Sequence, residues 1–171
     1  MLSDSSLERQ SHNESQNSTQ KFGANALPER LQVSIGGHFG PSYSVHFDGD
    51  SSLTYTRTKR REKDPWEIGS SEKWETKSEP VRPTQGRWAA FRAELDRLNV
   101  WCWQPEYFEP VCDGTGWSAE IVYSDKAIRS HGSNCFPGEA DKPVSIVDRA
   151  KGDTFDQFCR AVSCMVGRPF R

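Results

Sequence analysis

Hydrophobic and polar residues alternate along two neighbouring stretches of the chain, residues 31–35 and 43–47, and this pattern predicts β-strands. Asp48 and Gly49 follow the second stretch, and an Asp-Gly pair is typical of a hairpin turn. We therefore expect a return strand over residues 52–58, through Leu53 and Tyr55, that pairs with residues 43–47.

A second hairpin is expected in the other half of the chain, where apolar residues again occupy every second position from Trp117 to Tyr123. A Ser-Asp turn follows, and Ala127 begins the return strand. Residues 132–153 then lack a regular pattern, and we interpret them as irregular structure.

Two other stretches have apolar residues at intervals of three and four, which predicts amphipathic helices. The first begins at Trp88 and ends at Asn99, a residue type that tolerates the left-handed conformation of a helix stop. The following residues, 100–103, have the sequence VWCW and are predicted to form a short strand. The second helix is expected to begin at a capping box made by Thr154 and Gln157.

The remaining segments differ from these elements in composition. Residues 1–26 are rich in Ser, Asn, Gln and Glu, and such a segment cannot bury enough apolar surface to become ordered, so we predict a disordered polar tail. Residues 57–86 are rich in charge and contain three prolines, which indicates a long surface excursion. Residues 27–171 are predicted to form a single α+β domain.

The two halves of this domain share their spacing. Five residues of the first helix and its tail precede five of the second by a constant 67 positions: Trp88, Phe91, Leu95, Leu98 and Trp103 against Phe155, Phe158, Val162, Met165 and Phe170. Gly40 likewise precedes Gly114 by 74 positions, and the strand residues after each glycine keep that interval. We interpret this as two ββα-type repeats, about residues 31–103 and 111–170. The predicted fold is a two-layer sandwich in which an antiparallel sheet carries both helices on one face.

Composition restricts the cellular setting. The net charge is −2 and the mean hydropathy is −0.79, which argues against a general attraction to nucleic acid or to anionic lipid. No apolar run approaches the roughly 20 residues that span a bilayer, and the N-terminus does not resemble a secretory signal. The five cysteines form no CxxC pair, which is typical of reduced thiols. We expect a cytoplasmic protein without a membrane partner.

The glycine-rich stretch SIGGHFGPSY, residues 34–43, raises the question of a ligand-binding loop. A phosphate loop needs its glycines to lead into a helix N-terminus, but these glycines lead into a predicted strand. We therefore interpret them as a loop or bulge that needs positive φ angles. His38 in this loop remains a candidate proton carrier or binding residue.

A second polar cluster contains His131 and Cys135, which could act as a base and a nucleophile or as two metal ligands. Cys112 and His38 are additional candidate ligands, but their spacing matches no known metal motif. Asp113 lies beside glycines and has no identifiable carboxylate partner. A tight turn explains the composition of both segments equally well, so we predict no catalytic residue, metal or cofactor.

Basic residues are concentrated in RTKRREK, residues 57–63, which could follow a phosphate backbone while nearby tryptophans stack on bases. Acidic residues follow at once, and residues 57–86 contain eight basic and six acidic side chains. Trp101 and Trp103 provide a second aromatic pair, which either faces the helices or forms an exposed patch. The candidate binding residues are Trp66, Trp74, Trp101, Trp103, Arg57, Arg60, Arg61 and His38.

The sequence thus favours a non-enzymatic protein-interaction or accessory domain, such as an inhibitor or immunity-type protein, that binds a protein partner through a free sheet face and residues 57–86. One alternative is a nucleic-acid-binding module that uses residues 57–63. The other is a hydrolase-type enzyme that uses His38, His131 or Cys135.

Overall fold

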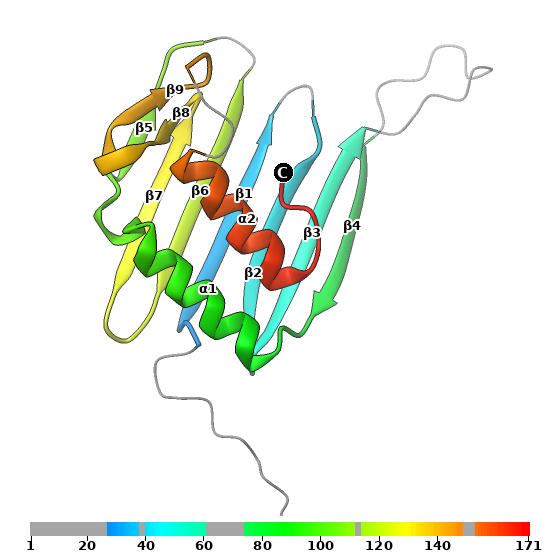
Figure 1. Ribbon diagram of the computed structural model, residues 1–171. Coiled ribbons are helices and arrows are strands. Elements are labelled where there is room, and N and C mark those ends of the chain that lie inside the picture. The colour runs from blue at the N-terminus through cyan, green and yellow to red at the C-terminus, as the bar shows by residue number, and fades with distance from the viewer. Residues whose placement is uncertain (1–26, 38–39, 61–73, 112–113, 149–152) are drawn as a thin grey trace, which may run out of the picture.

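The protein has a mixed α+β fold, and its described residues form two α-helices and nine strands in a mostly antiparallel arrangement (Figure 1). The computed structural model describes residues 27–37, 40–60, 74–111, 114–148 and 153–171. The predicted disordered tail, residues 1–26, lies outside the described residues.

Seven of the strands form one sheet with the order β4-β3-β2-β1-β6-β7-β5. Their bounds are β1 Arg30–Gly37, β2 Ser42–Gly49, β3 Ser52–Arg60, β4 Trp74–Val81, β5 Glu106–Phe108, β6 Thr115–Val122 and β7 Ala127–Ser133. All neighbours are antiparallel except β5, which runs parallel to β7. A separate pair consists of β8 Cys135–Pro137 and β9 Pro143–Ser145.

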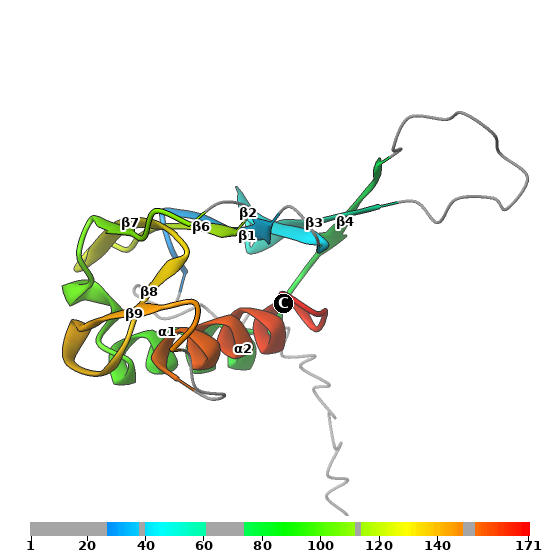
Figure 2. The same ribbon diagram turned by 90° about the horizontal axis from the view of Figure 1, so that it is seen from above.

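Helices α1 Gln85–Arg97 and α2 Thr154–Val166 lie on the same side of this sheet (Figure 2). Thr84 caps the N-terminus of α1, where its hydroxyl accepts a hydrogen bond from the Arg87 amide. Asp153 caps the N-terminus of α2, where its carboxylate accepts a hydrogen bond from the Asp156 amide at 2.7 Å. The predicted N-cap at Thr154 is therefore wrong by one residue, since the preceding aspartate caps the helix at least as well as a threonine.

The core lies between the helices and the sheet face that they cover. Alternate strand residues such as Leu31, Val33 and Ile121 are fully buried on this face, as the hairpin pattern predicted. An aromatic cluster surrounds Phe155 at the start of α2, with ring centroids 4.8 Å away in Trp117 and 5.0 Å away in Phe136. Burial of this apolar surface is the main stabilising contribution to the fold.

The turn of the first hairpin is shifted from its predicted position. Gly49 pairs with Ser52, so Asp50 and Ser51 form the two-residue loop, with φ angles of 47° and 62°. A bulge between Phe47 and Gly49 moves the turn beyond the Asp-Gly pair. Positive φ at both central residues matches the right-handed twist of the flanking strands.

Two other sequence predictions were wrong. The excursion over residues 57–86 contains the end of β3, the whole of β4 and the start of α1, although residues 61–73 lie outside the described part of the chain. Strand β4 was not predicted, because residues on both of its faces are exposed and its sequence lacks the alternation of hydrophobic and polar residues. The stretch VWCW forms a short 3₁₀ helix, Val100–Cys102, because the chain continues to turn after Asn99 adopts φ 51°.

The strand order contradicts the predicted duplication. Strands β2 and β6 both pair antiparallel with β1, so they run in the same direction. Seen from the side of the helices, β3 lies on one side of β2, whereas β7 lies on the opposite side of β6 (Figure 1). Two copies of one ββα unit would place the return strand on the same side, because no rotation converts a unit into its mirror image. The shared spacing reflects two amphipathic hairpins and helices of equal period.

Candidate functional site

One face of the seven-stranded sheet is not covered by any element of the described residues (Figure 2), and we call it the open face. Small polar side chains occupy it in register across the strands. Its middle row, ordered from β4 to β5, consists of Ser78, Thr56, Ser44, Ser34, Ser118, His131 and Glu106. The sheet therefore presents a row of five hydroxyl groups with a histidine and a carboxylate at its end.

Hydrogen bonds between hydroxyl groups fix several of these side chains. Ser34 and Ser118 lie 2.8 Å apart, and Thr56 lies 2.9 Å from Ser78. Thr58 bonds to Thr76 at 3.0 Å in the neighbouring row. Cross-strand hydroxyl pairs of this kind stabilise a sheet modestly and restrict the rotamers of their side chains, so these side chains are preorganised.

Two large aromatic side chains stand at opposite edges of the open face. Trp74 on β4 is 47% exposed and is paired with Arg60, and Phe108 on β5 is 64% exposed and is paired with Ser133. Exposed aromatic side chains are enriched in protein–protein interfaces relative to the rest of a protein surface.

The charges of the open face balance one another. Glu120 accepts hydrogen bonds from Arg129 at 2.7 Å and Arg30 at 2.8 Å, and these bonds lower the pKa of its carboxyl group. Glu106 lies 3.7 Å from His131 at the β5 edge. This surface lacks the one-sided positive charge that attracts nucleic acid.

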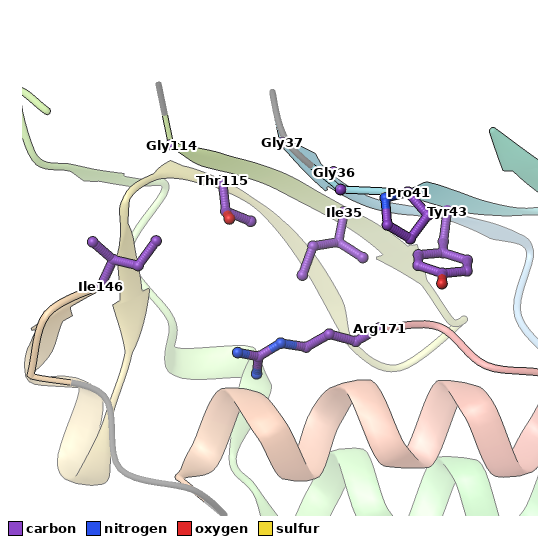
Figure 3. A pocket seen from close by; sticks show the side chains of 10 residues that line it. Ile35, Gly36, Gly37, Pro41, Tyr43, Gly114, Thr115, Ile146 and Arg171 are labelled. Atoms are coloured by element: carbon purple, nitrogen blue, oxygen red, sulfur yellow. The ribbon is translucent and has the colours of Figure 1, made fainter. Parts of the chain in front are cut away.

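A pocket of about 260 Å³ opens where β1 ends and where β2 and β6 begin (Figure 3). It brings together the two glycine stretches of the sequence, and its lining consists of Ile35, Gly36, Gly37, Gly40, Pro41, Tyr43, Gly114, Thr115, Ile146 and Arg171. Figure 3 shows the Arg171 side chain extending between the sheet and α2. The Arg171 guanidinium forms an ion pair with Asp156. Because this carboxylate already neutralises the guanidinium, the pocket does not favour an anion such as phosphate.

Close packing explains three of these glycines. A Cβ atom on Gly114 would lie 1.4 Å from Oδ1 of Asn134, and one on Gly37 would lie 2.8 Å from the Gly114 carbonyl oxygen. A Cβ atom on Gly36 would overlap the Ser42 side chain. The prediction that this stretch needs positive φ angles was wrong, since the glycines with positive φ in the described residues are Gly49 and Gly167.

The structure does not bring the predicted Cys-His pair together. His131 is exposed on the open face, whereas Cys135 is buried at the start of β8 on the side of the helices. Burial also raises the pKa of the Cys135 thiol, which keeps it protonated and weakly nucleophilic. His38 lies outside the described residues, as do Cys112 and Asp113.

The described part of the basic segment does not form a single positive stripe. Arg57 lies on the helix side of β3, with its guanidinium carbon 5.9 Å from the Tyr43 ring centroid, whereas Arg60 occupies the open-face register opposite Trp74. Of the other predicted binding residues, Arg61 and Trp66 lie outside the described residues.

Trp101 and Trp103 have structural environments: Trp103 lies in the core, and Trp101 belongs to a hydrogen-bond network. Trp103 is 6% exposed and packs against Phe158 at 5.2 Å between ring centroids, which places it in the core and not on a binding surface. Trp101 is partly buried, and its ring stacks edge-on against Tyr123 at 6.0 Å. Its indole nitrogen donates to Asp96 at 2.7 Å.

Asp96 is the centre of a network that ties α1 to the β6–β7 turn. Partial burial alone would raise the pKa of Asp96, but hydrogen bonds from Lys126, Trp101 and Arg92 outweigh it and lower the pKa to about 2. Arg92 also makes a bidentate contact with Asp125 at 2.9 and 2.7 Å. The network therefore stabilises the ionised form of Asp96 in the folded state.

Replacement of Asp96 with asparagine is expected to lower the free energy of unfolding by about 1 kcal/mol at pH 7, a value reduced for solvent screening. A carboxyl group with a lowered folded pKa stabilises the fold above its unfolded pKa of about 4, and this contribution is lost as the pH falls toward 2. Urea denaturation at pH 7 and pH 2 measures the effect. A difference between the variant and the parent that persists at pH 2 would contradict this origin.

The sequence analysis predicted Trp74 and a free sheet face, but it did not predict the row of hydroxyl groups on that face. Its signal was present in the strands, where the polar positions are mostly serine and threonine: Ser34, Ser44, Thr54, Thr56, Thr58 and Ser118. The sequence of a single strand does not show which of these residues become neighbours, because the register between paired strands determines which side chains lie next to each other.

No protein-family model matches the chain, and no curated protein is significantly similar to it in sequence. In the parts of the chain that the structure describes, neither helix is long and apolar enough to cross a membrane. Within the same residues, no three His, Cys, Asp or Glu side chains come together as a metal site would require.

Proposed function

We propose that this protein is a non-enzymatic interaction or accessory protein, built as a two-layer α+β sandwich, that holds a protein partner against the open face. The observation that carries the proposal is the row of hydroxyl side chains across the sheet, with Trp74 and Phe108 at opposite edges. An inhibitor or immunity protein is the kind of accessory protein that such a surface suits.

Three properties of the open face support a protein partner. Its side chains are short and held by hydrogen bonds, so little conformational entropy is lost on binding. Its charges are balanced, which suits a mixed protein surface better than a polyanion. Its two exposed aromatics provide the apolar contact area that polar rows lack.

Site-specific photo-crosslinking in the protein's native cells tests this proposal. A crosslinking residue in place of Ser44, at the centre of the open face, is expected to give one discrete protein adduct. The same residue in place of Ala93, on the exposed side of α1, serves as the matched control and is expected to give none. The absence of an adduct from position 44, or an equal adduct from position 93, would contradict the proposal.

A second comparison tests the aromatic anchors. Combined replacement of Trp74 and Phe108 with alanine is expected to weaken the adduct about tenfold or more, because anchor residues contribute most of the binding free energy. Val147 is 82% exposed in the segment after β9, and its replacement with alanine should leave the adduct unchanged.

A further inference from the structure

Strand β4 forms one edge of the sheet, and the described residues provide no neighbour on its outer side. Six of its eight residues are exposed, and Glu75 and Val81 are partly buried. An exposed edge strand of this length can pair with another strand unless its sequence prevents it.

Pro80 indicates which backbone groups of β4 face outward. Proline has no N–H group, so it is tolerated in an edge strand where its nitrogen points away from the neighbouring strand. Residues Thr76 and Ser78 share this orientation, because it alternates along a strand. Their hydroxyl contacts with Thr58 and Thr56 agree with it, since side chains approach most closely at pairs that lack ladder hydrogen bonds.

The charges of β4 are self-complementary in one antiparallel register. If Thr76 faces Thr76 of a second copy, Glu75 of each copy lies directly opposite Lys77 of the other, and Trp74 lies opposite Ser78. The outward groups of Trp74, Thr76 and Ser78 can then form about six backbone hydrogen bonds between the copies.

The neighbouring registers are disfavoured. If Lys77 faces Lys77, Glu75 lies opposite Glu79 and like charges meet at three positions. If Ser78 faces Ser78, Pro80 lies opposite Thr76, and the proline removes a hydrogen-bond donor from each side. Of these three registers, the charges and the proline of β4 favour the one centred on Thr76.

We propose that β4 is a dimerisation edge, which pairs antiparallel with β4 of a second copy of this chain around Thr76. The two-fold axis of such a pair is perpendicular to the sheet, so the two sheets continue into each other. Both open faces then lie on the same side. The inference goes beyond the proposed function, because the dimer would present two partner-binding surfaces in one plane.

Sedimentation velocity over a range of protein concentrations tests the dimer. The parent chain is expected to show a reversible monomer–dimer equilibrium. Lys77→Glu and Glu75→Lys are each expected to weaken dimerisation about tenfold or more, because each replaces two opposite-charge contacts with like-charge contacts. The double charge exchange, Glu75→Lys with Lys77→Glu, restores both contacts and is expected to recover most of the affinity.

A proline at position 76 supplies a charge-independent test. Thr76→Pro removes the central outward donor and is expected to abolish the dimer, while the melting temperature reports whether the monomer remains folded. A parent chain that stays monomeric at millimolar concentration would overturn the proposal. A double charge exchange that dimerises as weakly as the single variants would also overturn it. Neither result bears on crosslinking from position 44.

Discussion

Replacement of Phe155 with alanine is expected to lower the free energy of unfolding by about 3–5 kcal/mol, the range for deletion of a buried phenyl ring. Phe155 is 1% exposed at the first turn of α2. Its ring lies within 6.2 Å, between centroids, of Trp103 and within 4.8 Å of Trp117. It therefore joins the tail of α1, the sheet and α2, and its loss leaves a cavity that these elements cannot jointly fill.

Urea denaturation measured by tryptophan fluorescence checks this expectation. Phe108→Ala is the matched control, because it removes the same ring from a position that is 64% exposed. We expect the control to change the free energy of unfolding by less than about 0.5 kcal/mol. Equal losses in the two variants would show that the cluster around Phe155 does not dominate the core.

Replacement of Gly114 with alanine is expected to lower the free energy of unfolding by about 2–4 kcal/mol. The new Cβ atom would occupy the position of the Asn134 amide oxygen. Asn134 is buried, where it accepts from the Thr115 amide at 2.8 Å and donates to the Val111 carbonyl at 3.1 Å. A displaced amide leaves these buried polar groups without partners, and that loss adds to the steric cost.

Gly116 provides the control for this variant, because it lies two residues away, in β6, and a Cβ atom there would meet no atom closer than 4.0 Å. Gly116→Ala is expected to leave stability unchanged or to raise it by a few tenths of a kcal/mol, since glycine weakens a strand interior. Thermal denaturation of the two variants distinguishes them. A stable Gly114→Ala variant would mean that Asn134 can move without loss.

Local sequence patterns predicted the elements whose two faces differ. Strands β1, β2, β3 and β6 alternate between buried and exposed residues, and both helices have an apolar stripe, so each was predicted from its period. Strand β4 and the short strands β5, β8 and β9 lack that contrast or are too brief to display it. The predicted repeat failed for a related reason. A shared period records similar burial but contains no information about the side on which a return strand lies.

The candidate site was less predictable than the fold. Trp74 is an isolated tryptophan among charged residues, and the sequence analysis correctly selected it as an exposed residue. The sequence analysis also selected Trp103 as a binding residue, and only the structure shows that Trp103 is buried. The hydroxyl row depends on the register of five strands, and residues as distant in sequence as Ser34 and Ser118 become hydrogen-bonded neighbours.

The sequence by itself determined that this chain forms an α+β fold with two helices and two hairpins, because side-chain periodicity is a local property. Only the tertiary structure shows why glycines are required in SIGGHFGPSY. Its glycines at positions 36 and 37 make room for Ser42 and for the Gly114 carbonyl, and they adopt no unusual backbone conformation. Steric clearance depends on which atoms of distant segments pack together, and no local pattern in the sequence encodes those contacts.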